Sequence, residues 1–192
     1  MGRLLDVADC LLLVVDAQPS FYGGAPLQAQ AGALARAAWL AGVATALGVP
    51  ALVTEEDADR NGPTDPTIAA SLAAGTPILA KRVFGAADQP DILAAIEAIG
   101  RRTAVLVGLE TDVCVAHSAL GLLDRDYRVV VVDDATYSPG AMHEAGLRRV
   151  AAAGGEPVHA KGVYYEWIRT LDAARDVQRD HPDLAEPPGF SL

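Results

Sequence analysis

Short, continuously apolar runs alternate with longer alanine-rich segments along almost the whole chain of 192 residues. Runs such as LLLVV, AVLVG and VVVV are apolar at consecutive positions, which is typical of strands that helices cover on both faces of a sheet. The repeated alternation of strand and helix patterns indicates a mostly parallel, doubly wound α/β sheet. Since the pattern shows no internal repeat and no flexible linker, it predicts one domain.

The same pattern gives the expected bounds of each element. Strands are predicted at Cys10–Val15, Ala51–Thr54, Pro77–Lys81, Thr103–Val107, Arg128–Val132 and Glu156–His159. Helices are predicted over Leu27–Leu47, Thr67–Ala74, Pro90–Gly100, Val115–Arg125, Met142–Ala153 and Tyr164–Arg179. Ser138, just before Pro139, is expected to cap the fifth of these helices. The domain is predicted to span residues 1–180, and the proline-rich residues 181–192 form a surface arm or a contact with a partner chain.

Charge and cysteine content narrow the class of protein. Asp and Glu number 25 against 15 Lys and Arg, a net charge of -10 that repels phosphate backbones and anionic membranes. Two cysteines make no disulfide framework. Asp6 and Asp9 lie before the short apolar run of the N-terminal segment. This segment therefore predicts a first strand rather than a signal peptide. Glycines and a proline break the long uncharged stretch of residues 37–54, which disfavours a membrane span. We therefore expect a soluble cytoplasmic protein that binds neither nucleic acid nor membrane.

Reactive side chains follow three of the predicted strands. In doubly wound sheets, ligands bind outside the carboxyl ends of the strands. Asp16, Lys81 and Cys114 lie at such ends, although Asp16 alone could simply cap a turn. The spacing does not separate Lys81 from its neighbour Arg82 as the residue that faces a ligand. Cys114 could likewise be a small buried hydrophobic residue, as we expect for Cys10.

Cys114 differs from Cys10 in its local sequence, GLETDVC, which predicts a turn leading into a helix. A thiol at a helix N-terminus meets the positive end of the helix dipole, which favours the thiolate. A nearby carboxylate can accept the thiol proton, an ammonium can stabilise negative charge, and the sulfur can attack a carbonyl carbon. Backbone N–H groups of the turn could hold the resulting oxyanion.

Three stretches, LLLVVDAQPSFY, ILAKRVFGA and VLVGLETDVCVAHSALGLLDRDYRVVVVDDATYS, occur in the order of a known family. The chain resembles the isochorismatase-like cysteine hydrolases, which include nicotinamidases and N-carbamoylsarcosine amidases. The resemblance implies a single Rossmann-like domain with a six-stranded parallel sheet in the order 3-2-1-4-5-6. It also implies a catalytic triad of Asp16, Lys81 and Cys114, which selects Lys81 over Arg82. Finally, it implies a cis peptide at Leu109–Glu110 and an oxyanion hole formed by the backbone N–H groups of Glu110 and Cys114.

The chain departs from the family in two informative ways. Nicotinamidases bind a metal through an aspartate and two histidines after the second strand, whereas TEEDADRNGPTDP contains no histidine. Asp57 and Asp59 could bind a cation weakly, but we interpret this segment as a solvated acidic loop and expect neither metal nor cofactor. Members that hydrolyse the vinyl ether of isochorismate lack the cysteine at the position of Cys114, so a vinyl-ether hydrolase is kept only as an alternative. The expected activity is therefore that of an amidase-like thiol hydrolase acting on a small amide or carbamoyl compound.

Several aromatic residues are candidates for the pocket wall or for core packing, namely Phe21, Tyr22, Phe84 and Tyr137. His117 shares a helix face with Cys114, but the proposed triad gives it no required role. Trp39 is expected in the core or at a subunit contact, and Trp167 near the site of a neighbouring subunit. The resemblance further implies a homo-oligomer, either a dimer or a tetramer.

Three other functional classes remain open at this level. The first is a catalytically silent binding or scaffold protein, although an intact triad disfavours it. The second is a redox-active thiol protein, although no second cysteine lies near Cys114 in the sequence. The third is a flavodoxin-like cofactor binder, although the first strand-to-helix turn, DAQPSFYGGAP, has no GxGxxG phosphate cradle.

Overall fold

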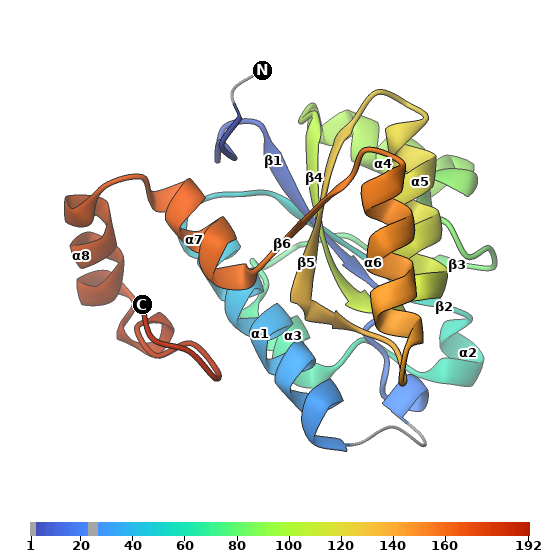
Figure 1. Cartoon of the computed structure of the whole chain (residues 1–192), viewed down its shortest axis with the longest axis horizontal. Coiled ribbons are helices and arrows are strands. Elements are labelled where there is room, and N and C mark those ends of the chain that lie inside the picture. Colours follow the sequence, from blue (N-terminus) through green and yellow to red (C-terminus); the bar gives the residue numbers. More distant parts are fainter. Residues whose placement is uncertain (1–2, 23–26) are drawn as a thin grey trace.

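A six-stranded parallel sheet forms the centre of the molecule, with its strands in the order β3-β2-β1-β4-β5-β6 (Figure 1). The computed structural model describes residues 3–22 and 27–192. Every residue of the two central strands, β1 (Cys10–Val15) and β4 (Thr103–Leu109), is buried, which explains their unbroken apolar sequences. The predicted α/β class, parallel sheet and strand order are confirmed.

The strands other than β1 and β4 are β2 (Ala51–Glu56), β3 (Ile78–Lys81), β5 (Arg128–Tyr137) and β6 (Glu156–Val158). Three strands, namely β2, β4 and β5, extend further than the apolar pattern predicts. The prediction ended β2, β4 and β5 where their apolar runs end, but backbone pairing continues to Glu56 opposite Lys81 and to Leu109 opposite Tyr137. β3 begins one residue later than predicted and β6 ends one residue earlier. The extra residues bring polar side chains to the carboxyl edge of the sheet.

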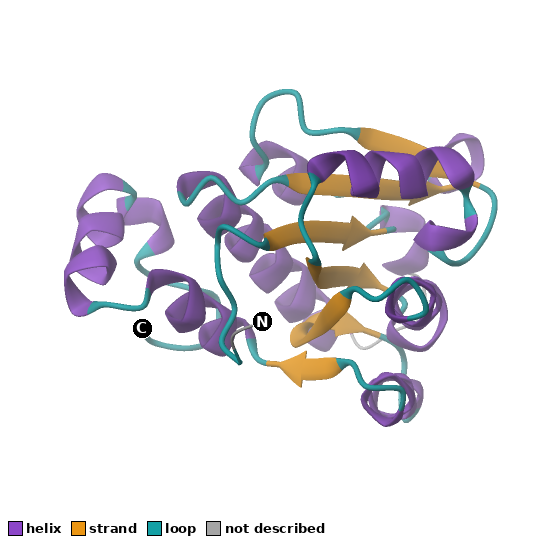
Figure 2. Ribbon diagram, turned by 90° about the horizontal axis from the view of Figure 1, so that it is seen from above, coloured by secondary structure: helices purple, strands orange, loops and turns teal. Residues whose placement is uncertain are grey.

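Helices cover both faces of the sheet (Figure 2). One face packs against α1 (Leu27–Ala46), α3 (Pro66–Ser71) and α7 (Ala160–Ile168). The other packs against α4 (Pro90–Ile99), α5 (Ala116–Leu123) and α6 (Met142–Ala152). A short helix, α2 (Ala58–Asn61), follows β2. Alternate residues of β1 point into these two cores, as the period of two in a strand requires.

The single helix predicted over Tyr164–Arg179 is wrong, because the chain forms two helices there. α7 ends at Ile168, and α8 (Leu171–Asp180) follows after a break. Arg169 has a φ of 67°, which does not continue an α-helix, and its guanidinium donates to the carbonyl of Leu5 at 2.6 Å. The Thr170 hydroxyl then accepts a hydrogen bond from Ala173 N at 3.1 Å and caps α8.

The residues after α8 fold back against the domain. Trp39 Nε1 donates to the carbonyl of Leu184 at 2.9 Å, and the ring of Phe190 meets Trp39 edge-on with centroids 5.4 Å apart. Trp39 also packs against Tyr164 of α7. Part of the expected C-terminal arm is therefore attached to the core of its own chain. Within residues 3–22 and 27–192, no helix is both long and apolar enough to cross a membrane.

Gly108 lets the two central strands approach closely where the site begins. Its φ of 119° is rarely adopted by L-residues, and a Cβ atom there would lie 2.0 Å from the carbonyl oxygen of Val15. Val15 pairs with Gly108 in the sheet and directly precedes Asp16. The close approach therefore places Asp16 beside the turn that carries Cys114.

Candidate active site

A buried ion pair between Lys81 and Asp16 lies at the carboxyl edge of the sheet. Lys81 Nζ is 2.6 Å from Asp16 Oδ2, and the two side chains are 0% and 1% exposed. The Thr54 hydroxyl donates to Asp16 Oδ1 at 2.8 Å, so both carboxylate oxygens are engaged. Burial raises the pKa of Asp16, and the positive charge of Lys81 opposes that rise. The Lys81 ammonium therefore stabilises the ionised form of Asp16 against the effect of burial.

Lys81 connects this ion pair to the thiol. Its ammonium donates to the carbonyl of Val83 at 2.8 Å and lies 3.6 Å from Cys114 Sγ. An ammonium has three protons, and these contacts together with Asp16 account for all of them. Three partners thus hold the Lys81 ammonium in place, and the Cys114 sulfur is one of them.

Cys114 lies in a single wide turn, Thr111–Val115, directly before α5. The N–H groups of Val113 and Val115 both donate to the carbonyl of Glu110 at 3.1 Å. The cysteine is 4% exposed. Burial, and after it the Asp16 carboxylate, raises the pKa of the thiol, while Lys81 lowers it. The expectation that the helix start favours the thiolate is wrong, because desolvation and a nearby negative charge outweigh it. Burial and Asp16 thus favour the protonated thiol, so attack by the sulfur calls for a proton acceptor.

Glu56 is a residue of the site that the sequence analysis missed. The thiol of Cys114 donates to Glu56 Oε2 at 3.3 Å. Glu56 is the last residue of β2, whereas the apolar pattern ended that strand at Thr54 and left Glu56 in an acidic loop. Since β2 lies next to β1 in the sheet, a strand two residues longer would have brought Glu56 to the same edge as Asp16.

Gln18 fixes the backbone of Glu56. Its side-chain amide accepts from Glu56 N at 2.7 Å and donates to the carbonyl of Glu56 at 3.1 Å. The same nitrogen donates to the carbonyl of Gly62 at 2.6 Å. Gln18 is fully buried, so this clamp is protected from water. The clamp therefore holds the end of β2 and the loop that follows it against the segment after β1.

The turn before Cys114 is held from β5 and α6. The peptide bond at Leu109–Glu110, where the resemblance implies a cis peptide, is cis. Ser138 Oγ donates to Asp112 Oδ1 at 2.6 Å and accepts from Asp112 N at 3.2 Å. The prediction that Ser138 caps a helix is wrong, because its hydroxyl binds this turn and α6 begins only at Met142.

Gly146 of α6 packs directly against the same turn. A Cβ atom there would lie 2.7 Å from Asp112 Cα and 2.8 Å from the carbonyl oxygen of Thr111, and neither backbone atom can move aside easily. We expect Gly146→Ala to cost about 1–3 kcal/mol of unfolding free energy and to slow alkylation of Cys114. Thermal unfolding and iodoacetamide kinetics measure these effects. In the control Gly32→Ala, a Cβ atom meets only the flexible Arg36 guanidinium. If Gly146→Ala behaves like this control, α6 does not position the turn.

Three possible metal ligands meet at the site, and a side-chain ammonium lies beside one of them. Asp16, Glu56 and Cys114 bring three possible ligand atoms within 4.8 Å of one another, the one such group among the described residues. Asp16 is already paired with the Lys81 ammonium, so a metal cation would have to displace that positive charge. In the loop after β2, Asp57 binds Arg82 at 3.1 Å, and Asp59 lies 3.9 Å from the same nitrogen. The Lys81 ammonium therefore already supplies a positive charge at this centre.

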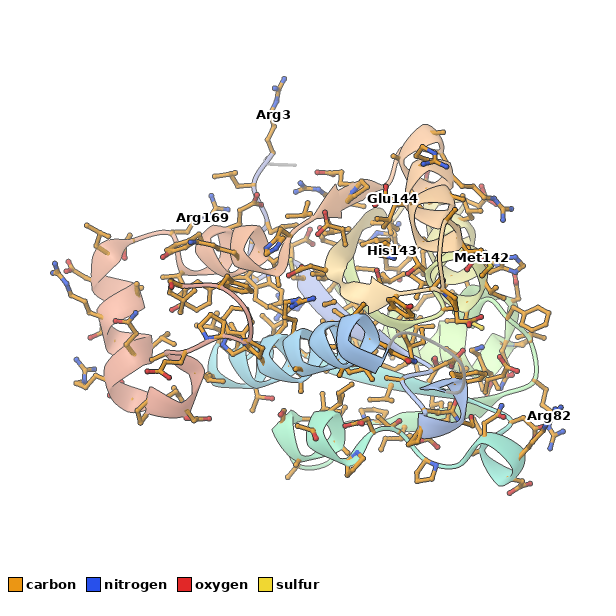
Figure 3. All side chains as sticks on the ribbon, turned by 60° about the horizontal axis from the view of Figure 1, so that its bottom comes forward. Arg3, Arg82, Met142, His143, Glu144 and Arg169 are labelled. Carbon is orange, nitrogen blue, oxygen red and sulfur yellow. The ribbon has the colours of Figure 1, made fainter. Side chains whose placement is uncertain are left out.

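Arg82 and Phe84, which follow Lys81, lie at the surface. The Arg82 side chain is 73% exposed and projects outward at the edge of the molecule (Figure 3). Phe84 is 53% exposed and meets His117 edge-on, with ring centroids 5.9 Å apart. His117 thus contacts an aromatic ring on the outer side of α5. Of these two neighbouring candidates, Lys81 and not Arg82 contacts the thiol.

The remaining candidates occupy different surroundings. Phe21 packs against the core on the α1 side of the sheet, and the side chain of Tyr22 lies outside the described residues. Tyr137 stacks on His143, with ring centroids 6.5 Å apart, and lines a cavity of about 460 Å³ between α1 and α6. His143 and its neighbours Met142 and Glu144 are labelled in Figure 3. Trp167 is 4% exposed and belongs to the core.

Together, the fold and the site define a doubly wound α/β protein with a buried thiol, an ammonium and two carboxylates at the carboxyl edge of its sheet. Residues 10–161 match the family model of the isochorismatase domain. The chain belongs to the isochorismatase-like hydrolase family, as the sequence resemblance predicted.

Curated relatives carry related names. The chain is 29% identical over 140 residues to the probable hydrolase YcaC of Escherichia coli K12, a match that covers 69% of this chain and 66% of that protein. It is 33% identical over 145 residues to isochorismatase domain-containing protein 2 of Rattus norvegicus, covering 75% of this chain and 63% of the rat protein. In both cases the match spans slightly less than two thirds of the relative.

Solved structures share the fold over nearly the whole chain. A structure of MAR1 ribonuclease from Caenorhabditis elegans has a TM-score of 0.84 at 24% identity and covers 99% of this chain and 98% of its own. YcaC from Pseudomonas aeruginosa, with hexane-2,5-diol and covalent acrylamide, has a TM-score of 0.79 at 26% identity and covers 96% and 95%. E. coli YcaC, described as an octameric hydrolase of unknown specificity, has a TM-score of 0.80 at 26% identity and covers 96% and 94%.

Proposed function

We propose that the protein is a cysteine hydrolase that cleaves a C–N bond of a small amide or carbamoyl compound through a thioester on Cys114. The observation that carries this proposal is the contact of one buried thiol with both an ammonium and a carboxylate. Cys114 Sγ lies 3.6 Å from Lys81 Nζ and 3.3 Å from Glu56 Oε2. A nucleophile next to a base and a fixed positive charge is the arrangement that covalent catalysis requires.

In this scheme, Asp16, Lys81 and Cys114 form the catalytic centre. The sulfur attacks the carbonyl carbon, and the backbone N–H groups of Glu110 and Cys114 stabilise the oxyanion. Asp16 takes the proton of Cys114, while Lys81 orients Asp16 and stabilises the negative charge that develops. The contacts of Ser138 and Gly146 with the turn support this role, because an oxyanion hole must be rigid before the substrate binds.

The charge of the site favours a neutral or cationic substrate. Burial and the nearby carboxylates of Asp112 and Glu56 raise the pKa of Glu110, which shows that acidic groups crowd the turn. Lys81 is already paired with Asp16, and Arg82 with Asp57. An anionic substrate would therefore meet carboxylates that have no ion-pair partner among the described residues, whereas a neutral amide would donate hydrogen bonds to them.

The proposal also includes the surroundings of the centre. Phe21, Phe84 and Tyr137 are proposed as pocket walls in the assembled protein, and no metal or cofactor takes part. The chain is proposed to act in the cytoplasm as a homo-oligomer, consistent with the description of E. coli YcaC as octameric. Residues 1–180 would form the hydrolase domain, with 181–192 as its C-terminal arm.

An ammonia-release screen over small primary amides and carbamoyl compounds tests the proposal. We expect at least one neutral compound to release ammonia with the native protein and none with protein alkylated by iodoacetamide beforehand. Anionic amides should react more slowly than neutral amides of the same size. Ammonia release that survives complete alkylation of Cys114 would refute the thiol mechanism.

A further inference from the structure

A cavity of about 460 Å³ lies between α1 and α6, beside the end of β5. Asp16, Lys81 and Cys114 do not line it, so it is separate from the thiol centre. Two residues of its α6 wall, His143 and Glu144, are labelled in Figure 3. Its volume falls in the range of sites that hold small organic molecules, so the polar groups of its wall decide which molecule fits.

Thr136 of β5 brings an unused hydroxyl to this cavity. Thr136 is 2% exposed, and its Oγ1 atom has no hydrogen-bond partner among the described residues. A hydroxyl that is buried without a partner loses the hydrogen bonds that it makes with water in the unfolded chain, and folded proteins rarely accept this cost. A polar ligand in the cavity would supply the missing partner.

Asp133 brings a carboxylate oxygen that also lacks a partner. Its Oδ1 atom is buried, and no donor within residues 3–22 and 27–192 binds it. Burial, and after it the negative charge of Asp134, raises the pKa of Asp133. A cation beside Asp133 would oppose both effects and stabilise the ionised carboxylate.

Asp134, the next residue of β5, differs because cationic side chains already neutralise it. Arg36 Nε lies 3.0 Å and His159 Nε2 lies 3.1 Å from Asp134 Oδ2. Since Arg36 is committed to Asp134, the carboxylates of Asp133 and of the exposed Glu144 have no ion-pair partner in the part of the chain that the structure describes. The wall of the cavity therefore carries an excess of negative charge.

We propose that this cavity binds a small organic ammonium ion whose N–H groups donate to Asp133 Oδ1 and Thr136 Oγ1. An ammonium group donates three hydrogen bonds and accepts none, which suits two oxygen atoms that lack donors. The apolar body of the ligand lies against Ala33 and Leu147. Among the described residues, no three carboxylate or histidine ligand atoms of this wall lie within 4.8 Å of one another, so the arrangement favours an organic cation over a bare metal ion.

The amine n-butylamine, which is protonated near neutral pH, provides a probe. In an NMR titration at low ionic strength, we expect saturable shifts of β5 and α6 amide signals with half-saturation below about 10 mM. Neutral 1-butanol and anionic butyrate share the apolar body and should bind at least about 10-fold more weakly. An amine that gives no saturable shift, or an alcohol that binds equally well, would overturn the proposal.

Two substitutions locate the ammonium in the cavity. Asp133→Asn should weaken binding at least about 10-fold, whereas the control Asp59→Asn, at a side chain that is 97% exposed, should stay within about two-fold of the native affinity. Thr136→Val should weaken binding at least about 3-fold and keep the native urea midpoint, because its hydroxyl has no partner in the described fold to lose. Native affinity in Asp133→Asn, or equal losses in both aspartate variants, would contradict the site.

Alkylation of Cys114 separates this inference from the proposed hydrolase activity, on which it does not depend. Protein treated with iodoacetamide should bind n-butylammonium with the native affinity, because the cavity lies apart from the thiol. Loss of binding after alkylation would place the ammonium at the thiol centre and overturn the inference. If the ammonium binds as expected and no amide is hydrolysed, the hydrolase proposal fails and this site stands.

Discussion

Lys81→Met is expected to lower the free energy of unfolding by about 3–5 kcal/mol and to abolish reactivity of the site. The Lys81 ammonium is fully buried and lies 2.6 Å from Asp16, which is itself buried. Removing the cation leaves a desolvated carboxylate whose remaining partner is the Thr54 hydroxyl. Urea denaturation of the native protein and the variant gives this difference directly. A loss below about 1 kcal/mol, the range of an exposed ion pair, would contradict the burial of the pair.

The same variant should show a defined pH dependence. Without Lys81, burial raises the pKa of Asp16 further above its unfolded value. A carboxyl whose pKa is higher in the folded protein than in the unfolded chain binds more protons when the protein is folded. The free energy of unfolding therefore falls as the pH rises from the unfolded-state pKa to the folded-state pKa. The deficit of Lys81→Met should therefore be smaller at pH 5 than at pH 8. The double variant Asp16→Asn/Lys81→Met should regain stability at pH 8, because no buried charge remains, yet stay inactive.

Cys114→Ala is expected to lower turnover of an amide or of para-nitrophenyl acetate by at least about 10⁴-fold, because a covalent mechanism has no substitute for its nucleophile. The fold should persist, since the change removes one sulfur from a buried position. Cys10→Ala is the matched control. Cys10 is equally buried, but it begins β1 at the opposite end of that strand from Asp16. Comparable losses in both variants would mean that stability, not chemistry, causes the effect.

The sequence predicts the sheet and three of the four reactive groups because these depend on local pattern. Continuous apolar runs identify β1 and β4 as buried strands, and the residues that follow them lie at the carboxyl edge by the geometry of parallel sheets. Asp16, Lys81 and Cys114 were found in this way. The choice of Lys81 over Arg82 needed the family resemblance, because the two neighbours lie at the end of the same strand.

Glu56 and Ser138 could not be found from the same signals. The apolar run of β2 ends at Thr54, and only its backbone pairing with β3 extends the strand to Glu56. Ser138 precedes a proline, as helix caps often do, but its partner Asp112 is distant in the sequence. The raised pKa of Cys114 also depends on burial and on Asp16, neither of which the turn sequence reveals. These features arise from contacts between segments, so local pattern does not reveal them.

The central claim is that the Cys114 sulfur forms a covalent acyl intermediate. The most direct measurement is mass spectrometry of the protein quenched at short times after mixing with para-nitrophenyl acetate, followed by peptide mapping. The account predicts one acetyl group on Cys114, absent from Cys10 and removed by hydroxylamine, that appears no later than the steady-state product. Turnover with no acetyl group on Cys114 at any quench time, or turnover by Cys114→Ala at the native rate, would contradict it.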